Sequence, residues 1–394
     1  MTASRRLVGI DLARTLALLG MFAAHLAVQE GAGPGGVSWL FQLVAGRSSA
    51  LFAVLAGVGI ALAAPLEAVR ADPRAYRRRL LVRSALIAGI GLVLGLPSSG
   101  IAVILAYYGV LFCCALPVLR WQARSLAWLA LGWGLLSPVV SLLLRQALPE
   151  PTLVVPSLAS LLVYPVQTVV ELLVTGYYPV LTWATYLFAG LAVGRWVQAR
   201  GGADRTVIGS LLVGGAAAAA LSIGVSALLL RSPQVRSALL DSVGLDAGSW
   251  AVLDADRRTG FYGTHPEESA WWLGVWAPHS GSIVDLVHTT GTALLVLGGC
   301  LAVVRLTPAL PWPVLAGAGR TTLTLYVAHV LILSTPLGDT GPLARDTTTG
   351  LLLHSLLALA AGGLIVATGR RGPLEAFLHQ ATHGPPARSP STRS

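Results

Sequence analysis

Apolar stretches long enough to cross a membrane recur along almost the whole chain. A hydrocarbon core needs about 20 mostly apolar residues in a helix. By this measure the sequence predicts ten spans, at residues 7–28, 39–64, 80–97, 101–119, 126–147, 178–198, 206–230, 281–304, 312–334 and 347–368. Segment 153–175 is also apolar, but it contains Pro156, Pro165 and Glu171, so we expect a re-entrant or interfacial piece on the outer side. The pattern predicts an all-α, polytopic membrane bundle that forms one domain over residues 1–378.

The positions of the arginines orient this bundle. Cytoplasmic loops of membrane proteins carry an excess of Lys and Arg. With the N-terminus in the cytoplasm, 18 of the 27 basic residues lie on the cytoplasmic side and six lie outside, and an eleventh span would reverse this bias after residue 175. We therefore predict ten spans with both termini cytoplasmic, in the inner (cytoplasmic) membrane of the cell. The tail 379–394 is rich in Pro, Ser and Arg, and we expect it to be disordered in the cytoplasm.

Composition supports a membrane protein and excludes other classes. Hydrophobic residues make up 55% of the chain and charged residues only 11%, whereas soluble domains carry about 25% charged residues. A net charge of +10 on so apolar a chain indicates no nucleic-acid partner. Cys113, Cys114 and Cys300 lie inside apolar stretches and offer neither a disulfide framework nor a metal-binding spacing. We expect no metal.

Three arginines, Arg14, Arg47 and Arg320, belong to neither side of the membrane in this assignment, and Asp11 accompanies them. Each arginine costs about 2.5–3.5 kcal/mol at the centre of a membrane helix, so such groups normally face a protein interior or a wet cavity. Asp11 and Arg14 lie three residues apart and could simply form a structural ion pair. Arg47 and Arg320 have no acidic residue in their own spans.

His25 follows Arg14 by eleven residues. Eleven steps of about 100° bring both residues to one helix face, about 16 Å apart along the axis. One face thus connects a basic group near the cytoplasmic side with a titratable base near the outer side, although a histidine at a helix end can also be an interfacial polar residue. His329, Tyr326 and His288 are further candidates, on the acceptor side; a packed polar helix would explain the polarity of segment 317–331 equally well.

Two loop regions carry candidate binding groups. Six arginines precede or begin the third span: Arg70, Arg74, Arg77, Arg78, Arg79 and Arg83. Guanidinium groups bind phosphates through paired hydrogen bonds, so a phosphorylated donor such as coenzyme A could dock there, although topology and anionic lipid explain the same cluster. The loop 231–280 contains four tryptophans, which could stack on sugar rings or form an interfacial aromatic belt.

Several segments together resemble the transmembrane acyltransferase superfamily, which includes the heparan-alpha-glucosaminide N-acetyltransferase catalytic domain, the YeiB-like proteins and acyltransferase family 3. The opening helix RRLVGIDLARTLALLGMFAAHL has the spacing of family 3, in which ten residues separate Arg from a catalytic His. Segments 46–62, 106–120, 176–195 and 317–331 are similar to the heparan-type and YeiB-like branch. The stretch HLAVQEGAGPGGVSW lacks the outer His-Trp-Asp arrangement of the heparan-type enzymes.

This resemblance implies a ten-helix fold that moves an acyl group, by inference acetyl, from cytoplasmic acyl-CoA to an outer glycan or cell-envelope acceptor. It implies His25 as the catalytic histidine and Arg14 as its partner. With them we group Asp11 as a catalytic candidate, and from their charge we expect donor binding by Arg47, Arg77, Arg78, Arg79, Arg83 and Arg320. The expected partners are the lipid bilayer, acyl-CoA and the acceptor, and a homodimer is compatible with this interpretation. The alternative is a transporter or exporter without covalent chemistry, because charges inside a membrane also mark transport pathways.

Overall fold

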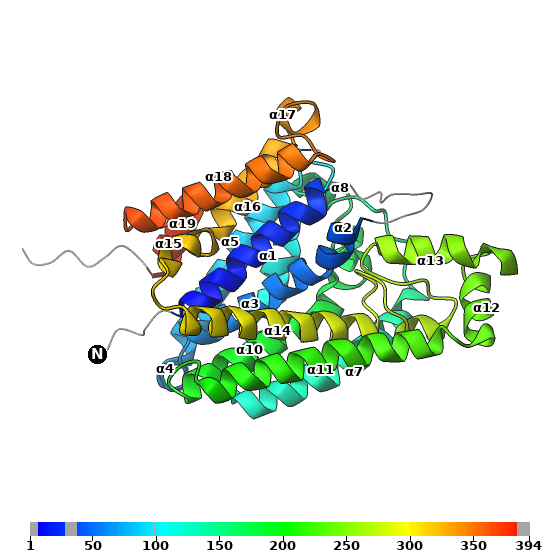
Figure 1. Cartoon of the computed structure of the whole chain (residues 1–394), viewed down its shortest axis with the longest axis horizontal. Coiled ribbons are helices and arrows are strands. Elements are labelled where there is room, and N and C mark those ends of the chain that lie inside the picture. The colour runs from blue at the N-terminus through cyan, green and yellow to red at the C-terminus, as the bar shows by residue number, and fades with distance from the viewer. Residues whose placement is uncertain (1–6, 28–37, 98, 384–394) are drawn as a thin grey trace, which may run out of the picture.

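The structure, a computed structural model, describes residues 7–27, 38–97 and 99–383, and these residues form helices and turns without a strand. Figure 1 shows long helices packed side by side, with a group of short helices beyond one end of the bundle. We call residues 231–280, which contain α12 (Pro233–Asp241), η2 (Ala247–Ser249), α13 (Trp250–Thr259) and η3 (Ala270–Gly274), the cap. The end of the bundle that carries them is the cap end, and the end at which α1 begins is the Val8 end.

In the described part of the chain, seven helices are long and apolar enough to cross a membrane. They are α1 (Val8–Leu26), the unit of α2 (Trp39–Val44) and α3 (Arg47–Ala63), α7 (Ala123–Arg145), α10 (Val180–Ala199), α11 (Arg205–Leu229), α14 (Ile283–Leu306) and α18 (Thr348–Ala367). Each corresponds to one of the ten predicted spans. The prediction of a polytopic helical membrane protein is confirmed to this extent, whereas the count of ten is not.

The other three predicted spans have a different form. Helix α5 (Pro73–Leu94) is long enough, but five arginines occupy its first eleven residues. Helix α6 (Leu105–Cys113) ends after nine residues and continues as turns. Segment 312–334 is divided into α15 (Trp312–Leu315), the short η4 (Gly317–Arg320) and α16 (Thr322–Leu333). Glycines favour such breaks because they cost conformational entropy inside a helix, and Gly317 and Gly319 lie at this one.

Segment 153–175 also breaks into short pieces: α8 (Leu158–Val163), α9 (Pro165–Val170) and η1 (Glu171–Thr175). Pro165 starts α9, because a proline fits the first turn of a helix but cannot continue the preceding one. None of the three pieces is long enough to cross a membrane alone.

Close helix packing positions the centre of the bundle. Helix α11 runs along α14, and α10 lies between α3 and α7. Gly57 of α3 faces Gly190 of α10 so closely that a Cβ at Gly57 would lie 2.9 Å from the backbone nitrogen of Leu191. Small residues of this kind let membrane helices approach each other closely.

Buried Arg195 of α10 joins three helix ends near the Val8 end. Its Nη2 donates to the carbonyl oxygen of Leu119 at 2.6 Å, and its Nη1 donates to the carbonyls of Ala61 and Ala64 at the end of α3. Ala64 follows the last residue of α3, so its carbonyl has no partner within the helix, and the carbonyl of Ala61 also accepts from Nε2 of Gln198 at 2.8 Å. This arginine therefore has a structural role.

The cap has a small core of its own, which accounts for one of the tryptophans in this loop. Trp272 is fully buried among Val235, Leu239 and Leu253, and its Nε1 donates to Ser242 Oγ at 2.9 Å. Trp271 beside it is exposed. Trp272 therefore stabilises the cap and cannot stack on a ligand.

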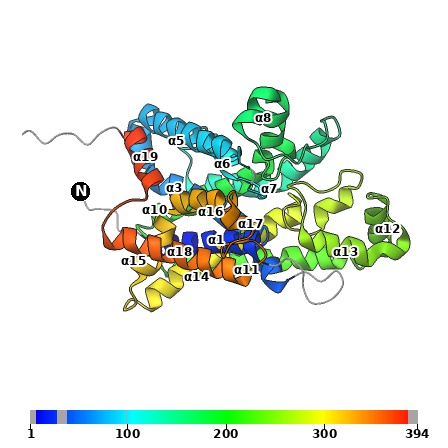
Figure 2. The ribbon, with the colours of Figure 1, turned by 90° about the horizontal axis from the view of Figure 1, so that it is seen from above.

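The start of α1 and the C-terminal helix α19 (Pro373–His383) lie toward the same end of the bundle in both ribbon views (Figures 1 and 2). Helix α19 includes the first residues of the tail that was expected from 379 onward, so that boundary falls inside a helix. Residues 384–394 lie outside the described residues.

We expect reporter fusions after Arg200 and after Arg371 to show a cytoplasmic location, because the arginine bias and the shared end of α1 and α19 agree on this orientation. A fusion after Asp246, in the cap, should report the opposite side. The measurement is the activity of a paired phosphatase and fluorescent reporter. An extracytoplasmic signal at Arg200 would contradict the predicted topology.

Candidate functional site

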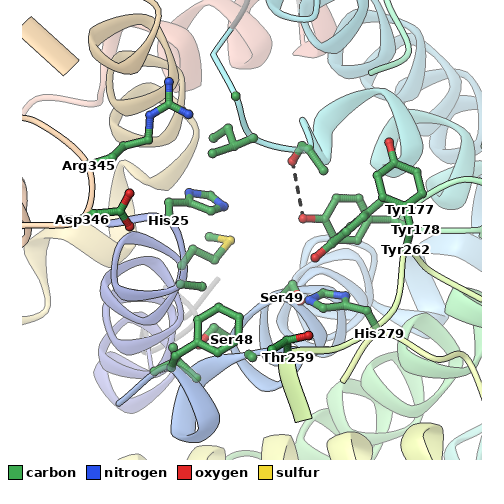
Figure 3. A pocket seen from close by; sticks show the side chains of 18 residues that line it. His25, Ser48, Ser49, Tyr177, Tyr178, Thr259, Tyr262, His279, Arg345 and Asp346 are labelled. Atoms are coloured by element: carbon green, nitrogen blue, oxygen red, sulfur yellow. Dashed lines mark hydrogen bonds between the residues drawn. The ribbon is translucent and has the colours of Figure 1, made fainter. Parts of the chain in front are cut away.

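A cavity of about 840 Å³ opens beside the end of α1, between the bundle and the cap. Met21, Ala24 and His25 of α1 line it together with Ser48 and Ser49 of α3. Figure 3 shows His25, Arg345 and Asp346 on one side of this space, and three tyrosines and His279 opposite them. The cavity is therefore built from the bundle, the cap and the loop before α18.

His25 is the titratable residue of α1 that reaches the cavity. Its Nδ1 lies 3.1 Å from Nε2 of His329 in α16, and the two rings stack with 12° between their planes. Since Nδ1 is engaged, Nε2 is the ring nitrogen that can meet a molecule in the cavity. A partly exposed imidazole with one nitrogen held is suited to accept a proton.

The opposite wall of the cavity is aromatic. Tyr177 packs against Tyr262 and His279, with ring centroids 4.9 Å and 4.6 Å away, and Tyr178 donates to the carbonyl of Ala102 at 3.4 Å. Burial, with a smaller contribution from His25, lowers the pKa of His279 to about 4. Burial, helped by Glu171, raises the pKa of Tyr262 to about 12. Both side chains are therefore neutral near pH 7, so this wall presents uncharged rings.

The wall on the other side carries charge. Arg345 pairs with Asp339 at 3.4 Å, and its guanidinium packs over Gly100, where any side chain would overlap it. Asp346 beside it adopts a left-handed backbone conformation with φ of 56°. Non-glycine residues rarely adopt this conformation, and such residues gather at functional sites. His279, on the aromatic wall, has the same feature, with φ of 55°.

Arg14 lies outside this cavity, toward the Val8 end. Its Nη1 donates to Oδ1 of buried Asp11 at 3.0 Å, which is the ion pair that their spacing allowed. Its guanidinium also faces Gly59 of α3, where a Cβ would lie 2.9 Å from Nη2. Arg83 of α5 is close enough to interact electrostatically with Arg14 and with Glu375 of α19.

Arg320 lies in the same region, at the end of η4. The preceding Gly319 donates its N–H to Thr15 Oγ1 of α1 at 2.9 Å, so η4 is held against the turn of α1 that carries Arg14. Glu375 accepts hydrogen bonds from the backbone of Leu323 and Thr324 at the start of α16. The structure thus gathers Arg14, Arg83 and Arg320 around the first half of α1.

The remaining arginines of the cluster lie on the surface of α4 (Leu66–Ala71) and of the first turns of α5. Arg70, Arg74, Arg77 and Arg78 are exposed, and the guanidinium of Arg79 lies 5.4 Å from the ring centroid of Tyr76. They are therefore accessible to a ligand that approaches the end of the bundle at which α5 begins.

Arg47 and His288 form a separate pair near the cap. Arg47 Nε donates to Nε2 of His288 at 3.0 Å, and its guanidinium lies 5.0 Å from the ring centroid of Trp276. Nδ1 of His288 lies 3.2 Å from the carbonyl of Ala219. Since both nitrogens of His288 are engaged and neither residue lines the cavity, the structure separates this pair both from His25 and from the arginines around Arg14.

Tyr326 and His329 differ although they lie on one helix. The hydroxyl of buried Tyr326 accepts a hydrogen bond from the backbone of Ile104 at 3.2 Å, so it links α16 to the start of α6. His329 contacts His25 directly. The sequence did not predict the aromatic wall or the position of Arg345. The local feature that could indicate this wall is the polar run Gly176-Tyr177-Tyr178 inside an apolar stretch.

Residues 6–230, more than half of the 394-residue chain, match the family model described as heparan-alpha-glucosaminide N-acetyltransferase, catalytic. The chain belongs to this family. No curated protein sequence matches the chain. The match to the N-acetyltransferase family covers His25, Arg14 and the arginine cluster, whereas His329 and Arg345 lie beyond it. Together with the apolar helices, the match identifies a multi-pass membrane protein of an acyltransferase family.

Proposed function

We propose that the protein is a membrane acyltransferase that moves an acetyl or other acyl group from cytoplasmic acyl-CoA to a sugar or cell-envelope acceptor on the other side of the inner membrane. The observation that carries this proposal is the position of His25, which faces a large cavity with one ring nitrogen held by His329. Membership in the N-acetyltransferase family supports the reaction class.

In this proposal the cavity holds the acceptor. A volume of about 840 Å³ is in the range of small-molecule sites. The uncharged rings of Tyr177 and Tyr262 offer flat apolar faces, while Arg345 and Asp346 offer groups that hydrogen-bond to hydroxyls. His25 would accept the proton of the attacking hydroxyl or amine, which is the role of a general base.

The donor would bind toward the Val8 end. Exposed arginines of α4 and α5 (Arg70, Arg74, Arg77 and Arg78) suit the phosphates of coenzyme A, with Arg79, Arg83 and Arg320 further along. Arg14, about 16 Å along α1 from His25, would contact the arm of the donor between its phosphates and the thioester, which reaches the cavity. Arg47 is not part of this proposal, because it is engaged by His288 and Trp276 near the cap.

The decisive experiment supplies purified protein in detergent or nanodiscs with radiolabelled acetyl-CoA, with and without extracted cell-envelope glycans. Transfer of label to a glycan, or slow hydrolysis of the thioester, is the expected result. Glycan uptake into proteoliposomes without any acetyl-CoA consumption would instead support the transporter alternative. Mass spectrometry of the envelope of a deletion strain would then identify the acceptor.

We expect Arg74→Gln, Arg77→Gln and Arg78→Gln, combined, to raise the KM for acetyl-CoA about tenfold with kcat nearly unchanged. Three exposed ion pairs of about 0.5 kcal/mol each account for this factor, and loss of uniform binding changes KM rather than kcat. Arg231→Gln, which removes an exposed arginine of the cap, is the matched control and should change neither KM nor kcat. An unchanged KM with correct membrane orientation would show that the cluster serves topology alone.

A further inference from the structure

A second histidine faces His25 across the cavity. Figure 3 shows the imidazoles of His25 and His279 projecting into this space from opposite walls, and both residues line it. His25 comes from the end of α1, whereas His279 lies in the last turn of chain of the cap, shortly before α14. Since His25 is the base of the proposed reaction, His279 is available for a second role.

Three aromatic side chains hold the imidazole of His279. The ring centroid of Tyr177 lies 4.6 Å away and that of Tyr178 lies 5.8 Å away, while the ring of buried Trp183 is parallel to it within 9° at 6.5 Å. Nδ1 of His279 is buried and has no hydrogen-bond partner among the described residues. Nε2 is therefore the nitrogen that can meet a molecule in the cavity.

The backbone at His279 is strained and held on both sides. Its φ of 55° is rare for a residue with a side chain, and such strain persists only where surrounding contacts fix it. Three residues earlier, the N–H of Trp276 donates to Ser226 Oγ of α11 at 2.9 Å. Two residues later, the N–H of Gly281 donates to Oδ2 of Asp285 of α14 at 3.2 Å. The segment that carries His279 is thus fixed to two long helices, which positions the imidazole before any ligand binds.

The imidazole of His279 can donate a hydrogen bond into the cavity. Because burial lowers its pKa to about 4, the ring is neutral near pH 7 and carries one N–H. Buried N–H groups without an acceptor are rare in proteins, so the unpartnered Nδ1 favours the form with the proton on Nε2. A hydrogen-bond acceptor in the cavity favours the same form, because only that form donates to it.

Acyl transfer requires such a donor. When the acceptor attacks the thioester, negative charge develops on the carbonyl oxygen, and donors fixed in advance around that position supply a large part of the catalysis. A neutral imidazole is able to polarise a substrate carbonyl in this way. The base must lie beside the attacking atom and the donor beside the carbonyl oxygen, so the two groups approach one carbon from different sides. His25 and His279 have this arrangement across the cavity.

We propose that His279 is a second catalytic residue, whose Nε2–H donates a hydrogen bond to the thioester oxygen as negative charge develops there. This inference rests on the proposed function, because it adds the oxyanion donor to that reaction. Tyr178, its neighbour on the aromatic wall, is engaged elsewhere, since its hydroxyl donates to the carbonyl of Ala102 at 3.4 Å.

The bond changes balance with these two histidines. The acceptor oxygen or nitrogen bonds to the thioester carbon, its proton passes to Nε2 of His25, and the π electrons of the carbonyl move to the oxygen beside His279. His279 keeps its proton throughout. As the carbonyl forms again, the carbon–sulfur bond breaks, and the sulfur leaves with the electron pair and takes the proton from His25. The products are the acylated acceptor and the CoA thiol, and both imidazoles regain their initial protonation.

The test compares His279→Leu, which removes the donor, with His279→Gln, whose amide N–H replaces it. Both variants place a side chain at the same left-handed φ, so they share the backbone cost. The probe is an acetyl-CoA analogue that cannot be cleaved, in which a methylene group replaces the sulfur and the carbonyl carbon carries a carbon-13 label. Difference infrared spectroscopy of the bound analogue reports the hydrogen bond to its carbonyl, and single-turnover transfer from acetyl-CoA reports catalysis.

We expect the carbonyl band of the bound analogue at lower wavenumber in the wild type and in His279→Gln than in His279→Leu. His279→Leu should lower kcat by about 10²–10³-fold at unchanged KM for acetyl-CoA, the typical cost of one oxyanion donor. His279→Gln should recover most of this loss. His265→Leu, which removes a buried imidazole of the cap outside the cavity, is the control and should change neither the band nor kcat. If His279→Leu does not fold, His279→Gly replaces it, because glycine adopts a positive φ without strain.

The two readouts separate this inference from the proposed function. If the band follows the donor but the wild type transfers no acetyl group, His279 contacts the donor carbonyl and the proposed function is wrong. If transfer occurs but the band is the same with and without the imidazole, His279 is not the oxyanion donor. If the folded wild type does not bind the analogue, both proposals are wrong.

Discussion

His25→Ala should abolish acyl transfer while the protein still inserts, folds and binds acyl-CoA. Removal of a general base typically lowers the rate by about 10²–10⁴-fold. The loss should fall on kcat, because His25 lies in the acceptor cavity, about 16 Å along α1 from Arg14 and the proposed donor site. The measurements are single-turnover transfer from labelled acetyl-CoA, donor binding at equilibrium and thermal stability.

His288→Ala is the control for the loss of an imidazole near the cap. It removes a partner of Arg47 but no group of the cavity, and Arg47 keeps its contact with Trp276. We expect the kcat of His288→Ala to stay within about tenfold of the wild-type value. If His25 were only an interfacial polar residue, His25→Asn should retain activity to the same extent. Full transfer activity in His25→Ala would exclude His25 as the base and make His329, its direct neighbour, the next candidate.

The sequence predicted those parts of the site that depend on one helix. Arg14, His25 and the Asp11–Arg14 pair follow from the period of α1, because an uninterrupted helix fixes which side chains share a face. The same reasoning found the seven long apolar helices. It predicted one continuous span over 312–334, because hydropathy does not register that the helix is interrupted at Gly317–Arg320.

Contacts between distant segments could not be predicted in this way. His354 lies on an apolar helix with no polar pattern around it, and its contact with His329, at 2.9 Å between the Nδ1 atoms, depends on how α18 packs against α16. Arg47 shows the same limit: it shares a charge with the arginines of α5, and the tertiary structure places it beside His288 and Trp276. The aromatic wall combines residues 177–178 with residues from the cap, which no local period connects.

Arg14→Gln should lower kcat/KM for acetyl-CoA by about 10–100-fold, the typical range for the loss of one hydrogen bond from a charged group to the donor. Glutamine has a similar length and can still donate to Asp11, so folding should be maintained. Arg14→Lys should retain more activity because it keeps the positive charge beside Gly59 and Asp11. The measurement is again single-turnover transfer, with acetyl-CoA binding measured separately.

The double variant Asp11→Asn/Arg14→Gln distinguishes a role of Arg14 in the reaction from a purely structural role, in which Arg14 only neutralises the buried carboxylate of Asp11. If Arg14 serves only to balance Asp11, which is 3% exposed, removal of both charges should restore activity, because no unpaired charge remains. If Arg14 contacts the donor, the double variant should stay as slow as Arg14→Gln, and Asp11→Asn alone should be mild. Such a cycle isolates the coupling of two groups that touch each other. We expect the second pattern, because Arg83 adds positive charge on the same side of α1 and the region is already more basic than one carboxylate requires. Restored activity in the double variant would exclude Arg14 from donor binding.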